Sequence, residues 1–399
     1  MCHVTKASNK GMRDLSALTV VKLKELLRAQ GLPVSGRKAV LIERLLAASP
    51  NVLEGLTAAA APAAQKTPAA QRTTTPRISP SDAIPRDVTP RRIVKDSSVP
   101  LLRVGSWNVA GLRGLLKRDA GLQSLKELVT TEQCDVIMLQ ETKLQEVHEA
   151  EVGRALLAAL HDPSAATRTW RSAFASSTAR KGYSGVCTLW NDRSLSADIV
   201  SSATCEPLAV DPGSEAEHEG RTLLLNLPLK PIELGFVNVY TPNSGAELAR
   251  LGYRTGAGGW DDKFRASLRG EQLFGDHLCV LGDLNAVMED ADFFNPHEAR
   301  TAKQAGTTPE ERESMRTYAM PPHSMADGFR AIHPSSHGQF TYWSQRARNR
   351  GRNRGLRIDY ALISSGLMAA NALVDVQHLH ELEGSDHCPV VMTLRLDRL

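Results

Sequence analysis

From Leu101 onward, short apolar runs alternate with amphipathic stretches. The apolar runs predict strands at Leu101–Trp107, Val136–Gln140, Gly185–Trp190, Thr222–Leu227, Gly235–Tyr240, Leu278–Gly282, Ile358–Ile363 and Val390–Leu394. The amphipathic stretches predict helices at Leu122–Thr131, Val147–Leu160, Trp260–Leu268 and Pro309–Tyr318. Many short strands with helices between some of them indicate an α/β domain over residues 101–399, with two sheets face to face and helices outside.

The beginning of the chain has a different pattern, because its leucines recur at helical spacing. Gly31 and Pro33 then form a stop signal, and a second amphipathic stretch runs from Lys38 to Leu46. We therefore predict a small two-helix unit over residues 14–48. The leucines of its first helix are Leu15, Leu18, Leu23, Leu26 and Leu27.

Residues 49–98 are rich in Ala, Pro, Thr and Ser, with scattered Arg. Large apolar side chains are few there, so their burial would not offset the entropy lost on ordering. We predict a flexible, basic linker between the two units.

Charge separates the same two parts of the chain. Residues 1–100 contain 16 Lys and Arg against 7 Asp and Glu, whereas the remainder contains 32 against 37. A basic arm on a mildly acidic body is typical of a polyanion tether joined to a domain that concentrates carboxylates. A merely solvated tail is the alternative.

Composition excludes several classes of protein. Hydrophobic residues make up 42% and charged residues 23% of the chain, as in soluble globular proteins. No apolar run approaches the roughly 20 residues that span a bilayer, and the first residues lack the apolar core of a secretory signal. The six cysteines form no CxxC pair, which favours a reducing, intracellular setting.

Polar residues stand where the predicted strands end. Each alone is most often a turn residue, but such groups can converge in one pocket where strands leave a core. They are Asn108, Gln140-Glu141-Thr142, Asp283-Leu284-Asn285 and Asp386-His387, with Asp359 early in a strand.

Phosphodiester hydrolysis explains this combination. Attack of water on phosphorus develops negative charge, which a hard cation such as Mg²⁺ neutralises, and Glu141 suits such a cation. Asp283 suits the carboxylate that orients or deprotonates the water. His387 paired with Asp359 forms a dyad that can hold a proton against the phosphate. Asparagines 108 and 285 can orient these groups without adding charge.

Seven motifs contain these residues: SWNVAGLR (106–113), LQETK (139–143), GYSGV (182–186), YTPN (240–243), GDLN (282–285), NRGLRIDY (353–360) and GSDHCP (384–389). In this order they resemble the exonuclease III family of abasic-site endonucleases, over about residues 101–399. The resemblance implies a four-layer α/β sandwich, the endonuclease/exonuclease/phosphatase fold.

The resemblance also implies a role for each matching residue. Glu141 would hold the catalytic Mg²⁺, for which Mn²⁺ can substitute, and Asp386 would lie beside it. Asp283 would act on the attacking water or the leaving group, with Asn285 positioning the water. The groups expected around the metal are Glu141, Asn108, Asp283, Asn285, Asp386 and His387.

Contacts with the substrate follow from the same resemblance. Tyr240 would contact the scissile phosphate, and His387, oriented by Asp359, would bind a phosphate oxygen. Asn108 would support the same centre. The residues expected to touch the DNA backbone are Arg113, Lys143, Tyr183 and Gly185.

Three positions depart from the family pattern. Ala110 replaces Asp or Asn and cannot ligate, which weakens a second metal position. Ala246 replaces an Arg that some relatives wedge into the DNA groove, and Leu356 replaces a Trp of the animal pocket. Tyr342, Leu356 and Ile358 are then expected to line a pocket that accepts a base-free sugar and rejects an intact nucleotide by shape. Because Leu356 is smaller than the Trp of the animal relatives, the pocket wall is smaller than theirs. This difference favours some incision of damaged nucleotides or trimming of 3′ ends.

A run of arginines without an acid lies between two of the pocket residues. Interleaved Gly and Asn predict a mobile loop whose arginines, Arg346 among them, grip duplex phosphates near the pocket. A solvated basic loop is the alternative. The arginines are Arg346, Arg348, Arg350, Arg352, Arg354 and Arg357.

Residues 18–46 resemble the SAP motif, a DNA- and chromatin-binding module, through KLKELL, GLP, GRK and LIERL. The candidate phosphate contacts are Lys22, Arg37 and Lys38. A protein-docking hairpin is the alternative. A SAP module joined to this nuclease type resembles plant and algal abasic-site endonucleases, and it would raise the local concentration on DNA.

The leading hypothesis is incision 5′ to abasic sites in double-stranded DNA, leaving a 3′-hydroxyl and a 5′-deoxyribose phosphate. Some 3′-phosphodiesterase or weak 3′–5′ exonuclease activity is expected beside it. The rivals are a general or RNA-directed phosphodiesterase of the same superfamily and a DNA-binding adaptor with a decayed site. We expect a monomer with no membrane contact, base-excision-repair proteins as further partners, and a nuclear location, with plastid or mitochondrion as alternatives.

Overall fold

The computed structural model describes Leu15 and residues 20–34, 37–48, 83–96, 98–161, 169–270 and 276–399. The chain divides into two compact units, Met1–Arg77 and Ile78–Leu399. None of the helices in these ranges is long and apolar enough to cross a membrane.

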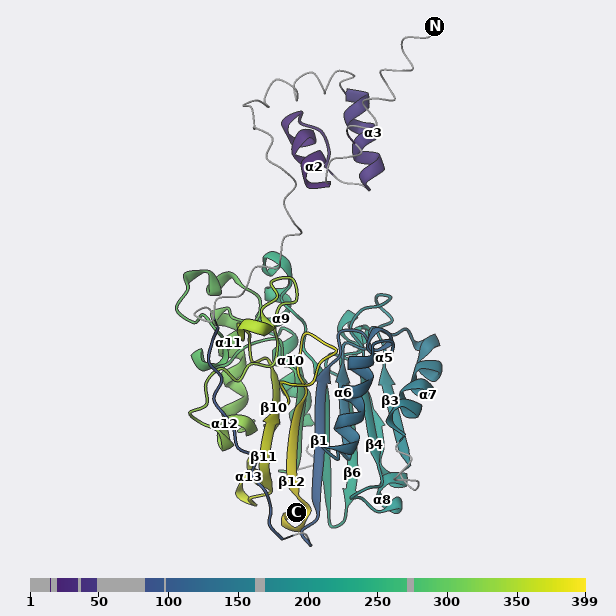
Figure 1. Cartoon of the computed structure of the whole chain (residues 1–399), viewed down its shortest axis with the longest axis vertical. Coiled ribbons are helices and arrows are strands. Elements are labelled where there is room, and N and C mark those ends of the chain that lie inside the picture. Colours follow the sequence, from purple (N-terminus) through teal and green to yellow (C-terminus); the bar gives the residue numbers. More distant parts are fainter. Residues whose placement is uncertain are drawn as a thin grey trace, which may run out of the picture. The chain divides into compact units, whose positions relative to one another are not determined.

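The larger unit contains two mixed sheets (Figure 1). Its strands are β1 Leu101–Asn108, β2 Val136–Gln140, β3 Trp170–Ala175, β4 Val186–Asn191, β5 Thr204–Glu206, β6 Thr222–Leu229, β7 Ile232–Tyr240, β8 Leu278–Asp283, β9 Ala326–Asp327, β10 Asp359–Ile363, β11 Leu373–His378 and β12 Val390–Arg395. Sheet A has the order β11-β12-β1-β2-β4-β3, and sheet B has the order β5-β6-β7-β8-β10-β9. The pairs β1–β2 and β7–β8 are parallel, and the other pairs are antiparallel.

The longer helices cover the outer faces of the two sheets, whereas three short ones pack against the core between the sheets through Val200, Phe329 and Leu367. The helices are α5 Leu112–Leu116, α6 Asp119–Thr130, α7 Glu149–Leu160, α8 Ala197–Ser202, α9 Leu251–Thr255, α10 Trp260–Gly270, α11 Pro309–Arg316, α12 Gly328–Ile332 and α13 Ser365–Ala369. Leu128 of α6 and Leu156 of α7 pack with the outer side of sheet A, while Phe264 of α10 and Met315 of α11 pack with sheet B.

The alternating direction of the side chains along a single strand shows why two sheets and two helix layers form. In β2, Met138 belongs to the core between the two sheets, whereas its neighbours Ile137 and Leu139 belong to the core under the helices. Because successive side chains point to opposite faces, a strand covered on both sides must be apolar throughout. The predicted four-layer α/β sandwich is confirmed.

All eight predicted strands and all four predicted helices of the larger unit are found within a few residues of the predicted ends. Helix α11 begins at Pro309 because the Thr308 hydroxyl accepts a hydrogen bond from the Glu311 amide at 3.2 Å. Strands β3, β5, β9 and β11 and several short helices were not predicted.

The smaller unit contains α2 Val20–Ala29 and α3 Lys38–Ala48, as the pattern predicts. Gly31, with φ +67°, follows α2 where the chain turns. Arg37 and Lys38 are exposed, whereas the side chain of Lys22 lies outside the described residues. The leucines at helical spacing that pack together are Leu15, Leu23, Leu27, Leu41 and Leu45.

One stretch that the sequence assigned to the linker lies along the larger unit instead. Residues 83–96, named the strap from here on, run as an extended segment over that unit. Arg91 donates to both oxygens of Glu132 at 2.7 and 2.5 Å, and the Arg92 amide donates to Asp375 at 3.0 Å. Most of the contacts that hold the strap are polar, so the low apolar content of this segment gave no sign that it packs on the larger unit.

Candidate active site

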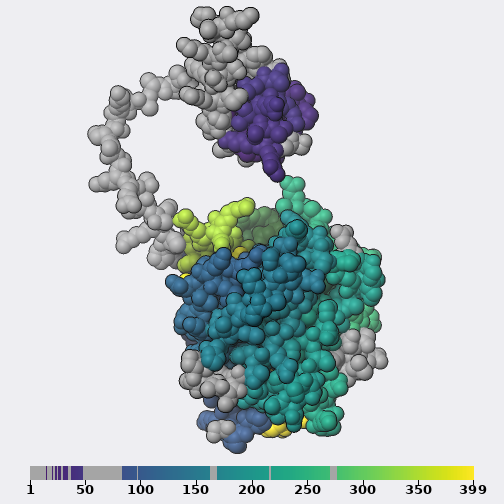
Figure 2. All heavy atoms as spheres, turned by 90° about the vertical axis from the view of Figure 1, so that its right-hand side faces the viewer, coloured from purple at the N-terminus to yellow at the C-terminus, as the bar shows by residue number. Residues whose placement is uncertain are grey.

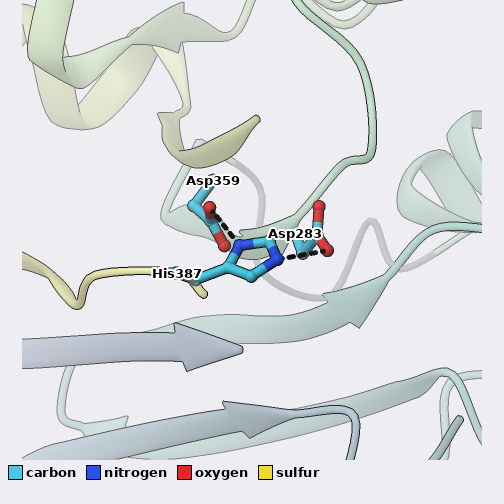
Figure 3. A group of neighbouring side chains, drawn as sticks. All are labelled: Asp283, Asp359 and His387. Carbon is cyan, nitrogen blue, oxygen red and sulfur yellow. Dashed lines mark hydrogen bonds and ion pairs between the residues drawn. The ribbon is translucent and has the colours of Figure 1, made fainter. Parts of the chain in front are cut away.

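Three buried ionisable groups meet where strands of sheet B end (Figure 3). Asp283 is the last residue of β8 and Asp359 the first of β10, and the antiparallel register pairs these two positions directly. His387 lies between their carboxylates. Its Nδ1 is 2.8 Å from Asp359 Oδ2, and its Nε2 is 3.9 Å from Asp283 Oδ2.

Backbone contacts fix the loop that carries His387. The Trp107 indole donates to the His387 carbonyl at 3.1 Å. The Ser385 hydroxyl accepts from the His387 amide at 3.2 Å and donates to the Asn108 carbonyl at 2.7 Å. These contacts tie the loop to the end of β1, so the imidazole is held between two sheets.

The two carboxylates control the charge of the imidazole. Burial opposes protonation, but the Asp359 carboxylate and its hydrogen bond outweigh it and raise the pKa of His387 to about 10. Burial, and then the Asp359 charge, raise the pKa of Asp283 to about 7. The Nδ1 atom is held by Asp359, and Nε2 faces Asp283; because the three groups lie within 4.8 Å of one another, His387 as a metal ligand stays a prediction.

Glu141, directly after β2, receives three donors. The Tyr240 hydroxyl lies 2.7 Å and the Asn108 amide 3.2 Å from its Oε1, while Lys143 Nζ lies 2.6 Å from its Oε2. Burial alone would raise the pKa of Glu141, but the Lys143 charge and these hydrogen bonds lower it. Burial and the Glu141 charge raise the pKa of Tyr240 well above its usual range, which keeps the phenol neutral.

Two asparagines orient the Asp283 carboxylate. Asn108 donates to Asp283 at 2.8 Å, and its own oxygen accepts from the Ala110 amide at 3.0 Å. Asn285 donates to Asp283 at 3.3 Å, and its oxygen accepts from Asn243 at 2.7 Å. Both asparagines therefore hold the Asp283 carboxylate in place, and their role as metal ligands stays a prediction.

Several residues at this edge have left-handed backbone that L-residues other than Asn and Asp seldom adopt. Such conformations at an active site cost free energy, about 1–3 kcal/mol each, and persist where surrounding contacts impose them. At Gly185, an added Cβ would lie 2.4 Å from Thr142 Oγ1, so only glycine fits. The non-glycine residues are Ala110, Glu141, Lys143, Ser184 and Asn285, with φ between +50° and +53°.

A cavity of about 680 Å³ opens beside these groups. Its lining includes the three predicted wall residues Tyr342, Leu356 and Ile358. The Tyr342 ring centre lies 4.9 Å from that of His387, and Tyr342 and Leu356 exchange backbone hydrogen bonds of 2.9 and 3.0 Å. The structure therefore brings the predicted pocket wall and the predicted catalytic groups into one cleft, whose lining also includes Glu141, Tyr240, Asp283, Asn285, Asp386 and His387.

Five of the residues predicted to touch the DNA backbone lie outside the cavity lining: Arg113, Lys143, Tyr183, Gly185 and Arg346. Arg113 and Arg346 are exposed, which leaves their guanidinium groups open to a partner. The Tyr183 hydroxyl accepts from Arg221 at 2.7 Å and also from Arg250. Glu219 pairs with both guanidinium groups, at 2.6 and 2.9 Å, so the two arginines fix the phenol in place, and contact of Tyr183 with DNA stays a prediction. That Lys143 and Gly185 contact DNA also stays a prediction.

The arginine-rich loop is only partly available for DNA. Arg357 is buried, with ion pairs of 2.8 Å to Asp292 and 2.6 Å to Asp327. Arg350 donates to the carbonyls of Ser385, His380 and Leu382 at 3.0, 2.9 and 2.6 Å. The prediction that all six arginines grip the duplex is therefore wrong for these two, because each is held by acceptors that are distant in sequence.

Three residues of the site were not assigned a role from the sequence: Asn243, Ser385 and Phe294. Asn243 and Ser385 lie inside the YTPN and GSDHCP motifs, which was the available signal. Phe294 and Arg354 line the cavity, with the guanidinium 5.4 Å from the ring centre. No motif marked Phe294, whereas Arg354 lies inside NRGLRIDY and was predicted to grip the duplex with the other arginines of its loop.

The model of the Endonuclease/Exonuclease/phosphatase family matches residues 105–387, and that of the SAP domain matches residues 14–48. The DNA repair nuclease APEX1 of Danio rerio is 34% identical over 304 residues, covering 75% of this chain and 84% of that protein. The exodeoxyribonuclease of Bacillus subtilis (strain 168) is 32% identical over 299 residues, covering 74% of this chain and 100% of that protein. The crystal structure of AP endonuclease LMAP from Leishmania major has a TM-score of 0.65 at 31% identity, covering 79% of this chain and 94% of that one.

Proposed function

This chain belongs to the Endonuclease/Exonuclease/phosphatase family, and from that premise we propose that it hydrolyses the phosphodiester bond 5′ to abasic sites in DNA. The products are a 3′-hydroxyl and a 5′-deoxyribose phosphate. A weaker trimming of blocked 3′ ends or of 3′-terminal nucleotides accompanies it, in line with the exodeoxyribonuclease among the relatives.

One observation carries this proposal: the Asp283–His387–Asp359 cluster and Glu141 share a cleft with an apolar wall. A base-free sugar can enter between Tyr342, Leu356 and Ile358. An intact nucleotide carries a base that this wall excludes by shape, so selection needs no reading of the base.

The chain's own groups divide the chemistry between them. Asp283, in its ionised form, takes a proton from the attacking water, which Asn285 holds in position. As the new P–O bond forms, the P–O3′ bond breaks, and the 3′-oxygen leaves as a hydroxyl after taking a proton from solvent. His387 donates a hydrogen bond to a phosphoryl oxygen and remains protonated, because Asp359 stabilises its charge. Tyr240 presents a neutral hydroxyl between Glu141 and the cleft.

We also propose that the reaction depends on Mg²⁺, with Mn²⁺ as a substitute. Glu141 and Asp386 are the carboxylates that face the cleft without belonging to the imidazole cluster, and hard divalent cations prefer such oxygens. When bound, the ion neutralises charge on the phosphate. Ala110 contributes no side-chain ligand, which supports a single metal position.

Lys143 competes for the same carboxylate. Its ammonium lies where a cation at Glu141 would bind, so Lys143→Met is expected to tighten Mn²⁺ binding about tenfold. Isothermal titration of Mn²⁺ into the full chain measures this. Lys117→Met, which removes an exposed lysine, is the matched control. Equal affinity in both variants and the wild type would refute the competition.

The pH profile of incision is expected to be bell-shaped. Asp283 acts ionised, so the rate rises as pH passes its raised pKa of about 7, and His387 acts protonated, so the rate falls above about 10. Asp359→Asn removes the charge that raises the pKa of His387, so the upper limb should move to lower pH. Single-turnover rates between about pH 5 and pH 11 test this. An upper limb unmoved in Asp359→Asn contradicts it.

A gel assay on a duplex with one abasic site tests the function itself. With Mg²⁺ we expect cleavage 5′ to the lesion, and with chelator none. Intact and 3′-blocked duplexes run beside it. Equal rates on all three would point to a general nuclease, and binding without cleavage would point to an adaptor with a decayed site.

The smaller unit supports the same proposal. We propose that the SAP domain binds duplex DNA through Arg37 and Lys38, both exposed, and keeps the nuclease near its substrate. A nuclear location and a monomeric enzyme are part of this proposal. Arg37→Ala with Lys38→Ala should weaken binding to any duplex about equally, as measured by fluorescence anisotropy, and leave the single-turnover rate at saturation unchanged.

A further inference from the structure

The strap reaches a loop that forms one side of the cavity. This loop, residues 337–354, is named the wall loop; Tyr342, Ser344 and Arg354 within it line the cavity. In Figure 2 the lime-coloured part of the chain around residue 350 stands at the upper rim of the larger unit. The strap precedes residues 105–387, which match the family model, so it is an addition to the matched region.

Hydrogen bonds join the strap to both ends of the wall loop. At one end, the Ile84 amide donates to the Arg352 carbonyl at 2.9 Å. At the other, the Asp87 amide donates to the His337 carbonyl at 3.1 Å, and the His337 amide donates to Asp87 Oδ2 at 2.8 Å. The strap therefore spans the base of the loop.

Asn353 connects these contacts to the interior of the loop. Its Nδ2 donates to the Ile84 carbonyl at 3.2 Å and to the Gly338 carbonyl at 2.9 Å. Its Oδ1 accepts from the Trp343 indole at 3.2 Å and from Arg86 at 3.4 Å. With φ +48°, its backbone is left-handed, which asparagine tolerates better than most residues.

Packing supports the same arrangement. The Ile84 side chain packs against a buried cluster of Phe340, Trp343 and Cys388, which Phe294 also joins. Cys388 follows His387 directly in the chain, and Phe294 lines the cavity. At Gly338, an added Cβ would lie 2.0 Å from the Pro85 carbonyl oxygen, so the loop has glycine where the strap crosses it.

We propose that the strap positions the wall loop for the abasic sugar, with Ile84, Arg86 and Asn353 as positioning residues. This inference rests on the proposed function. Without the strap, the Asn353 amide and two loop carbonyls lose partners, and the loop samples more conformations. Substrate binding must then order the loop, so KM rises while the chemical groups, held by other contacts, keep their rate.

Ile84→Ala and Ile93→Ala in the full chain form a matched pair. Both shorten an isoleucine of the strap, but Ile93 is 80% exposed and packs in none of the core clusters of the described residues. For the abasic duplex, Ile84→Ala should raise KM about tenfold with kcat within about twofold of wild type, and Ile93→Ala should change neither. Amide exchange in the wall loop should quicken in Ile84→Ala only.

Other outcomes overturn the inference. An unchanged KM and unchanged loop exchange in Ile84→Ala refute it, as does an equal effect of Ile93→Ala. If Ile84→Ala does not fold, by thermal melting, Arg86→Leu replaces it, with the same KM increase expected at about threefold. If the wild type fails to incise abasic DNA, the proposed function fails, and loop exchange still decides the role of the strap.

Discussion

His387→Ala is expected to lower the single-turnover rate of incision about 10³-fold or more, with duplex binding retained. The imidazolium is the positively charged group that Asp359 holds beside Asp283, and its loss leaves two buried carboxylates without a counter-charge. Repulsion between those carboxylates would keep Asp283 protonated and therefore inactive as a base. Gel kinetics at saturating enzyme measure the rate, and fluorescence anisotropy measures binding.

His161→Ala is the matched control, because His161 is exposed at the end of α7 and should leave the rate unchanged. A second variant, His387→Gln, retains a hydrogen-bond donor without the charge, so its rate separates hydrogen bonding from charge. A rate in His387→Ala within a few-fold of wild type would show that the cluster does not carry the reaction.

Glu141→Gln is expected to abolish specific Mn²⁺ binding and to reduce incision about 10³-fold. The amide is nearly isosteric with the carboxylate, and Tyr240 and Asn108 can still contact it, so the fold should persist. Lys143 loses its ion pair, which removes an attraction and also the desolvation of a charge. The free energy of unfolding should therefore change little.

Titration of Mn²⁺ and thermal melting check these points together with the rate. Glu146→Gln, which alters an exposed glutamate a few residues along, serves as the control. Wild-type Mn²⁺ affinity in Glu141→Gln would place the metal elsewhere, and the Asp283–Asp359–His387 cluster would then be the next group of ligands to test.

The central strands of both sheets could be predicted from the sequence because each is covered on both faces. Strand β2, with every residue buried, reads as a continuous apolar run. Strand β3 is the edge of sheet A and is half-buried, so its pattern is weak. Strand β11 contains a register shift between Leu373 and Asp375, which breaks the alternation that a pattern search needs.

The convergence of the candidate groups could be predicted because the motifs place them at strand ends. The sequence could not distinguish an arginine that meets phosphate from one that meets a buried acid. Arg357 pairs with Asp292, 65 positions earlier, and only the fold brings the two together. The sequence likewise could not give the orientation of the Asn108 and Asn285 amides, because it depends on neighbours such as Ala110 and Asn243.

The direct pairing of Asp283 with Asp359 across β8 and β10 limits how the gene for this chain can change in length. Insertion of one codon within either strand would turn every later side chain of that strand to the opposite face. One of the two carboxylates would then point away from the His387 imidazole, although the sheet itself could still form. Duplications and deletions should therefore be tolerated in the surface loops. Inside these two strands they should abolish catalytic turnover.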